Sequence, residues 1–88
     1  MKLIIAILRD EDTDEVSQAL ITGGYRVTRI ASTGGFLRKG SSTLMIGVDD
    51  ERVDGAIQVV QDNLSKSVEL GLKRATLFVL NVDRFTQV

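Results

Sequence analysis

Residues Tyr25 to Val48, YRVTRIASTGGFLRKGSSTLMIGV, predict two β-strands joined by a long polar loop. The strands are expected over Tyr25 to Ala31 and Ser42 to Val48, where apolar and polar residues alternate. Arg26 and Thr28 stand two residues apart, so on a strand they point to the same face of the sheet. This unit predicts that the first strand of the pair presents a cation and a hydroxyl beside the loop.

The loop from Ser32 to Gly40 is longer than a chain reversal requires. Its residues combine glycine backbone, positive charge and one aromatic ring: Gly34, Gly35, Phe36, Leu37, Arg38, Lys39 and Gly40. Such a loop suits a phosphate-bearing aromatic ligand, because glycine amides approach anions closely. The segment GFLRKGSS resembles a P-loop, but it has Ser41 where the lysine belongs and lies between two strands. A binding loop and a merely long hairpin both remain open.

The chain before this unit predicts a strand and a helix. Lys2 to Leu8 is apolar after its first residue, so both faces of this strand are expected to be buried. The helix is expected to open within the acidic run at Asp10, with Asp12 and Glu15 at the spacing of a capping box. Gly23 and Gly24 are expected to end it.

The chain after this unit predicts a second helix and a last strand. Asp49 and Asp50 are expected to cap the helix, whose apolar residues recur at helical spacing from Val53 to Leu64. Ala75 to Val82 is almost continuously apolar, which predicts a central strand. The order βαββαβ predicts a single α+β domain over residues 1–88, a ferredoxin-like sandwich with two helices on one face of a four-stranded antiparallel sheet.

The other face of this predicted sheet has no covering element in the chain. The first and last strands are apolar on both sides, so this face is expected to be covered by further copies, most simply in a closed ring. The tail from Asp83 to Val88 could reach a neighbouring subunit or a ligand.

The composition disfavours several kinds of function. A net charge of −1 argues against broad binding to nucleic acid or to an anionic membrane. The chain has no cysteine, so disulfides, thiolate metal sites and cysteine nucleophiles are excluded. It also has no histidine, the commonest general base and metal ligand. The run DEDTDE lacks the glycine and glutamate of an EF-hand and is interpreted as a solvated helix N-terminus. Lys39 and Thr33 are the only plausible catalytic groups, and an enzyme is not expected. With no membrane span or signal peptide evident, a cytoplasmic protein is expected.

Three side chains have two interpretations each. Arg26 is either a surface arginine paired with an acid or a phosphate ligand. Phe36 either covers a subunit interface or stacks on a base. Phe78 is interpreted as core by default and as a ligand contact otherwise.

The segments MKLIIAI, TGGFLR, GVDDERVD and ATLFVLNVDRFTQV resemble the PII-like family of cyclic di-AMP receptor proteins. The resemblance implies a PII-like ferredoxin fold, a homotrimer, and cyclic di-AMP bound between subunits for signalling rather than catalysis. It implies phosphate contacts at Arg26 and Thr28 and adenine packing on Phe36 and Leu37. Further ligand contacts are implied at Gly35, Gly47, Phe78 and Gln87. No cofactor and no metal are implied.

The chain departs from that family at three places. Gly24 and Ser41 stand where receptors of the family carry asparagine, and only Ser65 to Arg74 bridges a gap that a long loop occupies elsewhere. The leading hypothesis is a trimeric receptor for cyclic di-AMP, with an unidentified protein effector as a possible partner. The alternatives are a receptor for another adenine nucleotide, a nucleotide-independent trimeric interaction module, and a small nucleotide-directed enzyme.

Overall fold

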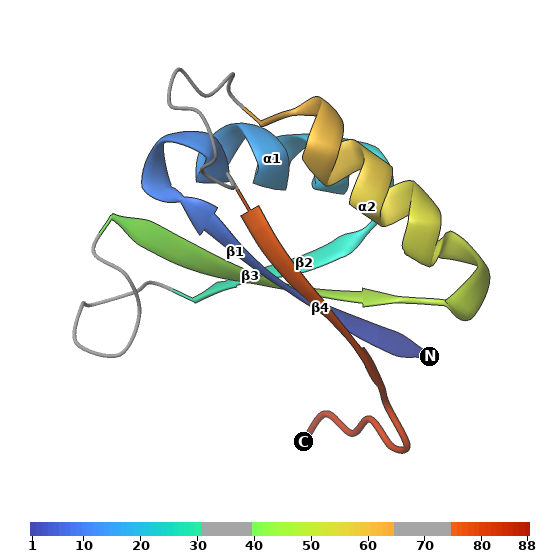
Figure 1. Ribbon diagram of the computed structural model, residues 1–88. Helices are drawn as coiled ribbons and strands as arrows, with labels where there is room; N and C mark the ends of the chain where they lie inside the picture. Colours follow the sequence, from blue (N-terminus) through green and yellow to red (C-terminus); the bar gives the residue numbers. More distant parts are fainter. Residues whose placement is uncertain (31–39, 65–74) are drawn as a thin grey trace.

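The computed structural model describes residues 1–30, 40–64 and 75–88, and Figure 1 shows how they are arranged. The elements in chain order are β1 (Lys2–Arg9), α1 (Asp10–Thr22), β2 (Arg26–Ile30), β3 (Ser41–Val48), a short 3₁₀ helix (Asp50–Arg52), α2 (Val53–Asp62) and β4 (Ala75–Asn81). The four strands form one antiparallel sheet in the order β2-β3-β1-β4. This is the ferredoxin-like α+β fold that the sequence predicts.

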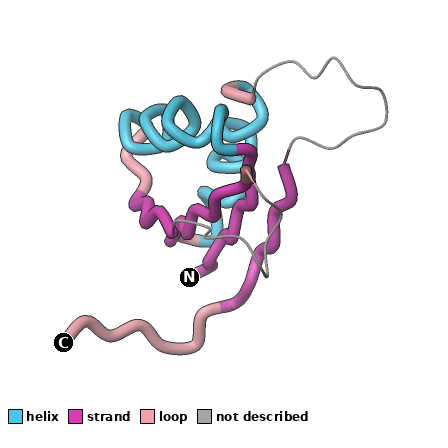
Figure 2. The backbone as a smooth tube through the Cα atoms, turned by 90° about the vertical axis from the view of Figure 1, so that its left-hand side faces the viewer, coloured by secondary structure: helices cyan, strands magenta, loops and turns pink. Residues whose placement is uncertain are grey.

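Both helices lie on one face of the sheet (Figures 1 and 2). The core between the layers consists of side chains that are at most 5% exposed: Ile4, Ala6, Leu8, Val16, Leu20, Leu44, Ile46, Val48, Ala56 and Val60. In β1, and in β3 from Leu44 to Val48, buried apolar residues alternate with half-buried ones, so only one face of β1 is fully buried within the described chain, not both as predicted. Leu44, Ile46 and Val48 are therefore inward-facing, as predicted. No helix in the described ranges is long and apolar enough to span a membrane.

The start of α1 differs from the predicted capping box. The helix begins at Asp10, and its N-cap residue Arg9 has no side-chain cap. Asp12 thus lies within the first turn, where it is 1% exposed rather than solvated. The first turn is tied down by Thr13 Oγ1, which donates to the Arg9 carbonyl (3.0 Å), and by the Ser42 hydroxyl, which donates to Asp10. Contacts with β3 therefore replace the local cap.

The end of α1 follows the prediction. Gly23 is the C-cap, and its N–H donates to the Ala19 carbonyl at 3.0 Å. Gly24 follows at φ +85°, a left-handed conformation that glycine adopts without strain.

The start of the second helical segment also differs in detail. Asp49 is the N-cap of the 3₁₀ helix but makes no side-chain cap, and Asp50 lies beyond it. Ala56 and Val60 of α2 are buried, and Val53, Ile57 and Leu64 pack against the core, as predicted. The predicted fraying from residue 65 to 71 lies outside the described residues.

Strand β4 lies at the edge of the sheet, so the prediction of a central strand was wrong. It pairs with β1 alone among the described strands. Phe78, Val79 and Leu80 are 51%, 44% and 45% exposed. Continuous apolar sequence indicates burial on both faces, but this burial is not supplied by the chain itself.

The Tyr25 side chain packs between the end of α1 and the start of α2. The Arg52 guanidinium carbon lies 4.2 Å from the centre of the Tyr25 ring, and Arg52 Nη2 donates to the Gly23 carbonyl at 3.0 Å. A Cβ at Gly55 would lie 2.8 Å from the Tyr25 hydroxyl oxygen. The ring therefore packs where α2 carries no side chain.

We expect Gly55→Ala to destabilise the native chain because the rigid Tyr25 side chain must shift. In a Tyr25→Phe background the hydroxyl is gone, and the same change should be neutral or stabilising by up to about 1 kcal/mol through helix propensity. Urea unfolding of the four proteins measures this coupling. An identical effect of Gly55→Ala in both backgrounds would contradict the contact.

Candidate functional site

Arg26 and Thr28 lie on the sheet face opposite the helices. The register pairs Arg26 with Gly47 and Thr28 with Met45, and these rows continue to Leu3 and Ile5 of β1. Their neighbours along each strand, including Ile4 and Ile46, are buried against the helices, so alternation directs both rows the other way. Arg26 and Thr28 share one face, as the sequence predicts, and both are exposed.

Gly47 has no side chain, so its backbone is not covered by the residue itself beside Arg26. A Cβ at this position would lie 3.2 Å from the methyl carbon of Met1, so that side chain extends over the glycine. Met1 is 49% exposed, and its carbonyl accepts from the Val82 N–H at 3.1 Å. A flexible thioether is thus the neighbour that a ligand approaching Gly47 meets first.

The amino group of Met1 is held by Asp50. The two charged groups are 3.1 Å apart. The hydrogen bond from this amino group, with its charge, holds the pKa of the Asp50 carboxyl below its usual 3.8, and Lys2 adds a smaller effect in the same direction. The pair therefore fixes the backbone from which the Met1 side chain reaches Gly47.

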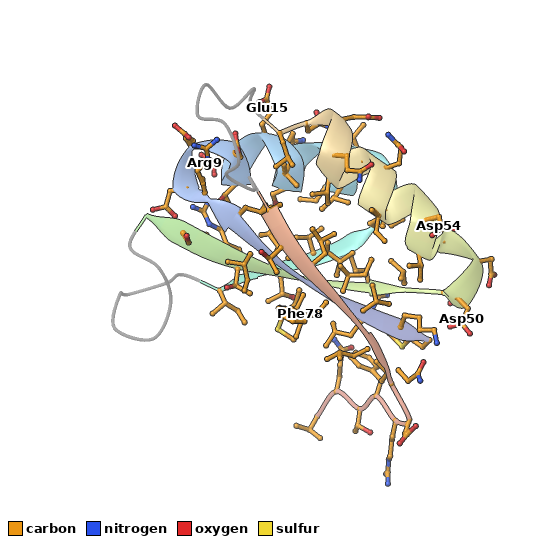
Figure 3. The ribbon with its side chains drawn as sticks, viewed as in Figure 1. Arg9, Glu15, Asp50, Asp54 and Phe78 are labelled. Carbon is orange, nitrogen blue, oxygen red and sulfur yellow. The ribbon has the colours of Figure 1, made fainter. Side chains whose placement is uncertain are left out.

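Phe78 lies on the same face as Arg26 and Thr28 but at the other edge of the sheet. It pairs with Ile5, which pairs with Met45 and through it with Thr28. Three strand spacings, about 14 Å, therefore separate Thr28 from Phe78. Figure 3 shows Phe78 on the side of the sheet away from the helices, and its 51% exposure contradicts the default interpretation as core.

The remaining predicted residues are in two other segments. Gln87 lies in the exposed C-terminal segment, which Figure 2 shows extending beyond the sheet, with Phe85 58% exposed. Gly35, Phe36 and Leu37 lie outside the described residues, as do the alternative catalytic groups Thr33 and Lys39. The structure therefore brings Arg26, Thr28 and Gly47 together within the chain and places Phe78 apart.

Sequence reasoning missed Thr43. It pairs with Ile7 and Ile30, on the same face as Thr28, and is 7% exposed. Its hydroxyl oxygen is buried and has no hydrogen-bond partner in the described structure. The alternation of Ser41, Thr43, Met45 and Gly47 was the signal that could have indicated its direction.

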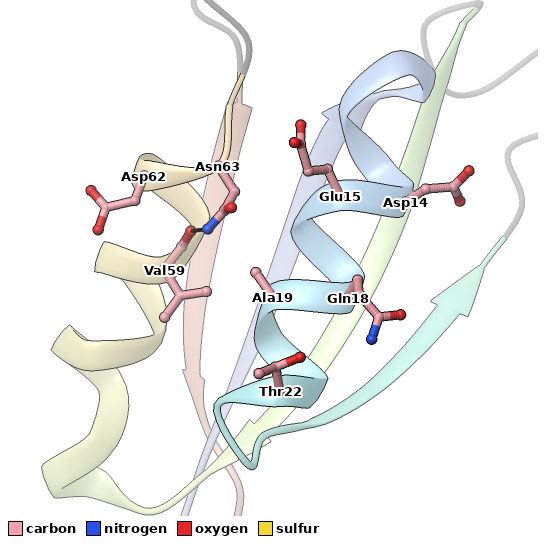
Figure 4. Close-up of a pocket in the computed structure, with 8 residues that line it drawn as sticks. All are labelled: Asp14, Glu15, Gln18, Ala19, Thr22, Val59, Asp62 and Asn63. Carbon is pink, nitrogen blue, oxygen red and sulfur yellow. Dashed lines mark hydrogen bonds between the residues drawn. The ribbon is translucent and has the colours of Figure 1, made fainter.

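A groove of about 730 Å³ lies between α1 and α2 (Figure 4). It is lined by Asp14, Glu15, Gln18, Ala19, Thr22, Val59, Asp62 and Asn63. Three of these side chains are acidic, and none belongs to the predicted site. Since a phosphate would be repelled by the carboxylates, the groove does not suit a nucleotide.

Charge is divided unevenly between the helical elements and the rest of the chain. Residues 10–22 and 50–62, which form the helices, contain nine acidic side chains and one basic one, Arg52, and so carry a net charge of −8. Because the whole chain carries −1, all other residues together carry +7. The sheet residues Arg26 and Lys2 belong to this positive part, which favours an anionic ligand away from the helices.

No group of three or more potential metal-ligating side chains occurs among the residues that the structure describes. The described strands direct guanidiniums, hydroxyls, a glycine and apolar side chains to the open face. This set binds anions and flat apolar groups by hydrogen bonds and contact.

Residues 1–70 match the sequence profile of the family described as cyclic-di-AMP receptor. The chain belongs to this family. The match includes β1, α1, β2, β3 and α2, and with them Arg26, Thr28 and Gly47. It ends before β4, so Phe78 and Gln87 lie beyond it.

A solved structure extends the likeness over the whole chain. The chain is 33% identical to a functionally unknown protein from Pediococcus pentosaceus ATCC 25745, with a TM-score of 0.80. The alignment covers 99% of this chain and 96% of that one.

We expect an NMR titration to place the pKa of Asp50 below 3.8. Acetylating the Met1 amino group should raise it towards the ordinary value, because the positive partner is removed. A lowered pKa in the folded state means that the pair stabilises the fold above the unfolded pKa and that this contribution is lost as pH falls through the folded pKa. An Asp50 pKa unmoved by acetylation would contradict the pairing.

Proposed function

We propose that this chain is a signalling receptor that binds cyclic di-AMP at the interfaces of a homotrimer, with Arg26 as its phosphate ligand. The observation that carries the proposal is the contrast between two arginines of β2. Arg29 Nη1 lies 2.7 Å from Asp14 Oδ1, on the helix side. Arg26 is exposed on the open face and has no ion pair or hydrogen bond within the described structure.

The neighbours of Arg26 support this role. Thr28 adds a hydroxyl on the same face, and Gly47 lies directly opposite Arg26, covered by the flexible side chain of Met1, which a ligand can displace. A hydrogen bond between a guanidinium and a phosphate is charge-assisted and worth about 1.5–3 kcal/mol. The positive charge of the chain outside its helices favours the same ligand. Gly35, Phe36 and Leu37 are proposed to contact adenine, as the family resemblance implies.

The position of Phe78 supports a site between subunits. Within one copy it stands about 14 Å from Thr28, at the opposite sheet edge. A ligand can contact both when the β2 edge of one copy meets the β4 edge of the next. Gln87, in the segment after β4, would then approach the same ligand. The exposed apolar face at Phe78 and Leu80 supports association of copies.

The proposed role is binding without catalysis. The family is one of receptors, and the groups gathered on the open face hold an anion rather than activate a nucleophile. A protein effector that responds to the loaded trimer completes the proposal. Another adenine nucleotide is the alternative ligand, since Gly24 and Ser41 replace asparagines of related receptors.

We expect Arg26→Ala to weaken cyclic di-AMP binding by about 10- to 100-fold, because a charge-assisted hydrogen bond is lost. Arg29→Ala is the matched control and should leave affinity within about threefold, since Arg29 faces the helices. Calorimetry with cyclic di-AMP, AMP and ATP measures both variants and the native chain. Absence of binding by all three nucleotides at millimolar concentration would refute the receptor proposal and favour a nucleotide-independent interaction module.

We expect Leu80→Glu to dissociate the trimer, because it places a charge on the apolar face that copies are proposed to share. Ile21→Glu is the control: Ile21 is 54% exposed and lies on α1, away from that face. Light scattering after size-exclusion chromatography gives the mass of each variant. A native chain that elutes as a monomer, or a Leu80→Glu variant that stays trimeric, would count against the interface.

A further inference from the structure

Thr43 has a buried polar atom that the fold leaves unsatisfied. The residue is 7% exposed, and its hydroxyl oxygen has no hydrogen-bond partner in the described structure. Buried polar groups in folded proteins are nearly always paired, so each exception requires an explanation. The register places Ile7 and Ile30 on either side of Thr43, and neither side chain offers an acceptor.

Thr43 is also close to the proposed ligand contacts. Thr28 pairs with Met45, two residues along β3 from Thr43, so the two threonines are diagonal neighbours on one face. The Cβ atoms of such neighbours are about 7 Å apart. Thr28 is exposed, whereas the Thr43 hydroxyl is covered, so one phosphate group can accept hydrogen bonds from both once the side chains over Thr43 move aside.

We infer that Thr43 is a further ligand-binding residue, whose hydroxyl donates to a phosphate oxygen of the bound nucleotide. This inference rests on the proposed function. The unpaired hydroxyl lowers the stability of the ligand-free fold, and the ligand removes that cost when it binds. Thr43 thereby favours the loaded state, because the hydrogen bond to the ligand is the one that satisfies the buried hydroxyl.

The test uses Thr43→Val, which keeps the shape and removes the hydroxyl, together with Thr43→Ser, which keeps the hydroxyl. We expect Thr43→Val to raise the Kd for cyclic di-AMP about tenfold and Thr43→Ser to stay within about threefold of the native chain. The melting temperature of ligand-free Thr43→Val should equal or exceed the native value. Thr76→Val is the control, since Thr76 lies in the same row but is exposed.

The outcomes separate this inference from the proposed function. Thr43→Val binding as tightly as the native chain, while Arg26→Ala does not bind, overturns this inference alone. A ligand-free Thr43→Val that melts much lower, or that loses the oligomeric state, also overturns it, because the hydroxyl is then paired within the protein assembly. A native chain that binds no nucleotide overturns both.

Discussion

The antiparallel pairing of β1 with β3 is the constraint on which the arrangement of this molecule depends. It joins the two inner strands over eight residue pairs, from Lys2 opposite Val48 to Arg9 opposite Ser41. Along each strand, successive side chains then point alternately to the helices and to the opposite face. A register shift of one residue would exchange these two faces. Ile4 and Ile46 pack under the helices, and Arg26 is consequently directed away from them. The direction of the candidate site residues is thus a consequence of how the core packs.

The same constraint separates two electrostatic environments. The helical elements are strongly acidic, and the rest of the chain is strongly basic, although the total charge is near zero. Asp14 neutralises Arg29, the one β2 arginine that faces the helices. Arg26, three residues earlier, stays uncompensated in the described structure. Two identical side chains on a five-residue strand therefore differ in availability only because of which face they occupy.

Sequence reasoning identified the elements and their order because the apolar periods are regular. Gly23 and Gly24 end the first helix as expected, and Leu44 and Ile46 are buried as their alternation indicates. The errors arise where tertiary contacts override local signals. Asp12 is buried in the first turn instead of capping it. Asp50 forms an ion pair with the amino group of Met1, the residue before β1, instead of capping the helix.

The site was less predictable than the fold, for a similar reason. Apolar sequence cannot tell a central strand from an edge strand, so β4 was misplaced and Phe78 was taken as core. The unpaired hydroxyl of Thr43 is invisible in a sequence because it depends on which neighbours surround it. The common direction of Arg26 and Thr28 could be predicted because a strand has a period of two, whereas Gly47 was implied by the family resemblance alone.

The edge position of β4 has a consequence for the newly made chain. The segment Thr76–Leu80 has no charge, no proline and strong β-propensity, and its outer backbone groups pair with no described strand. An edge of this kind is a template for uncontrolled fibrous growth. The newly made chain therefore carries an edge that no described strand covers and that can pair with other extended chains.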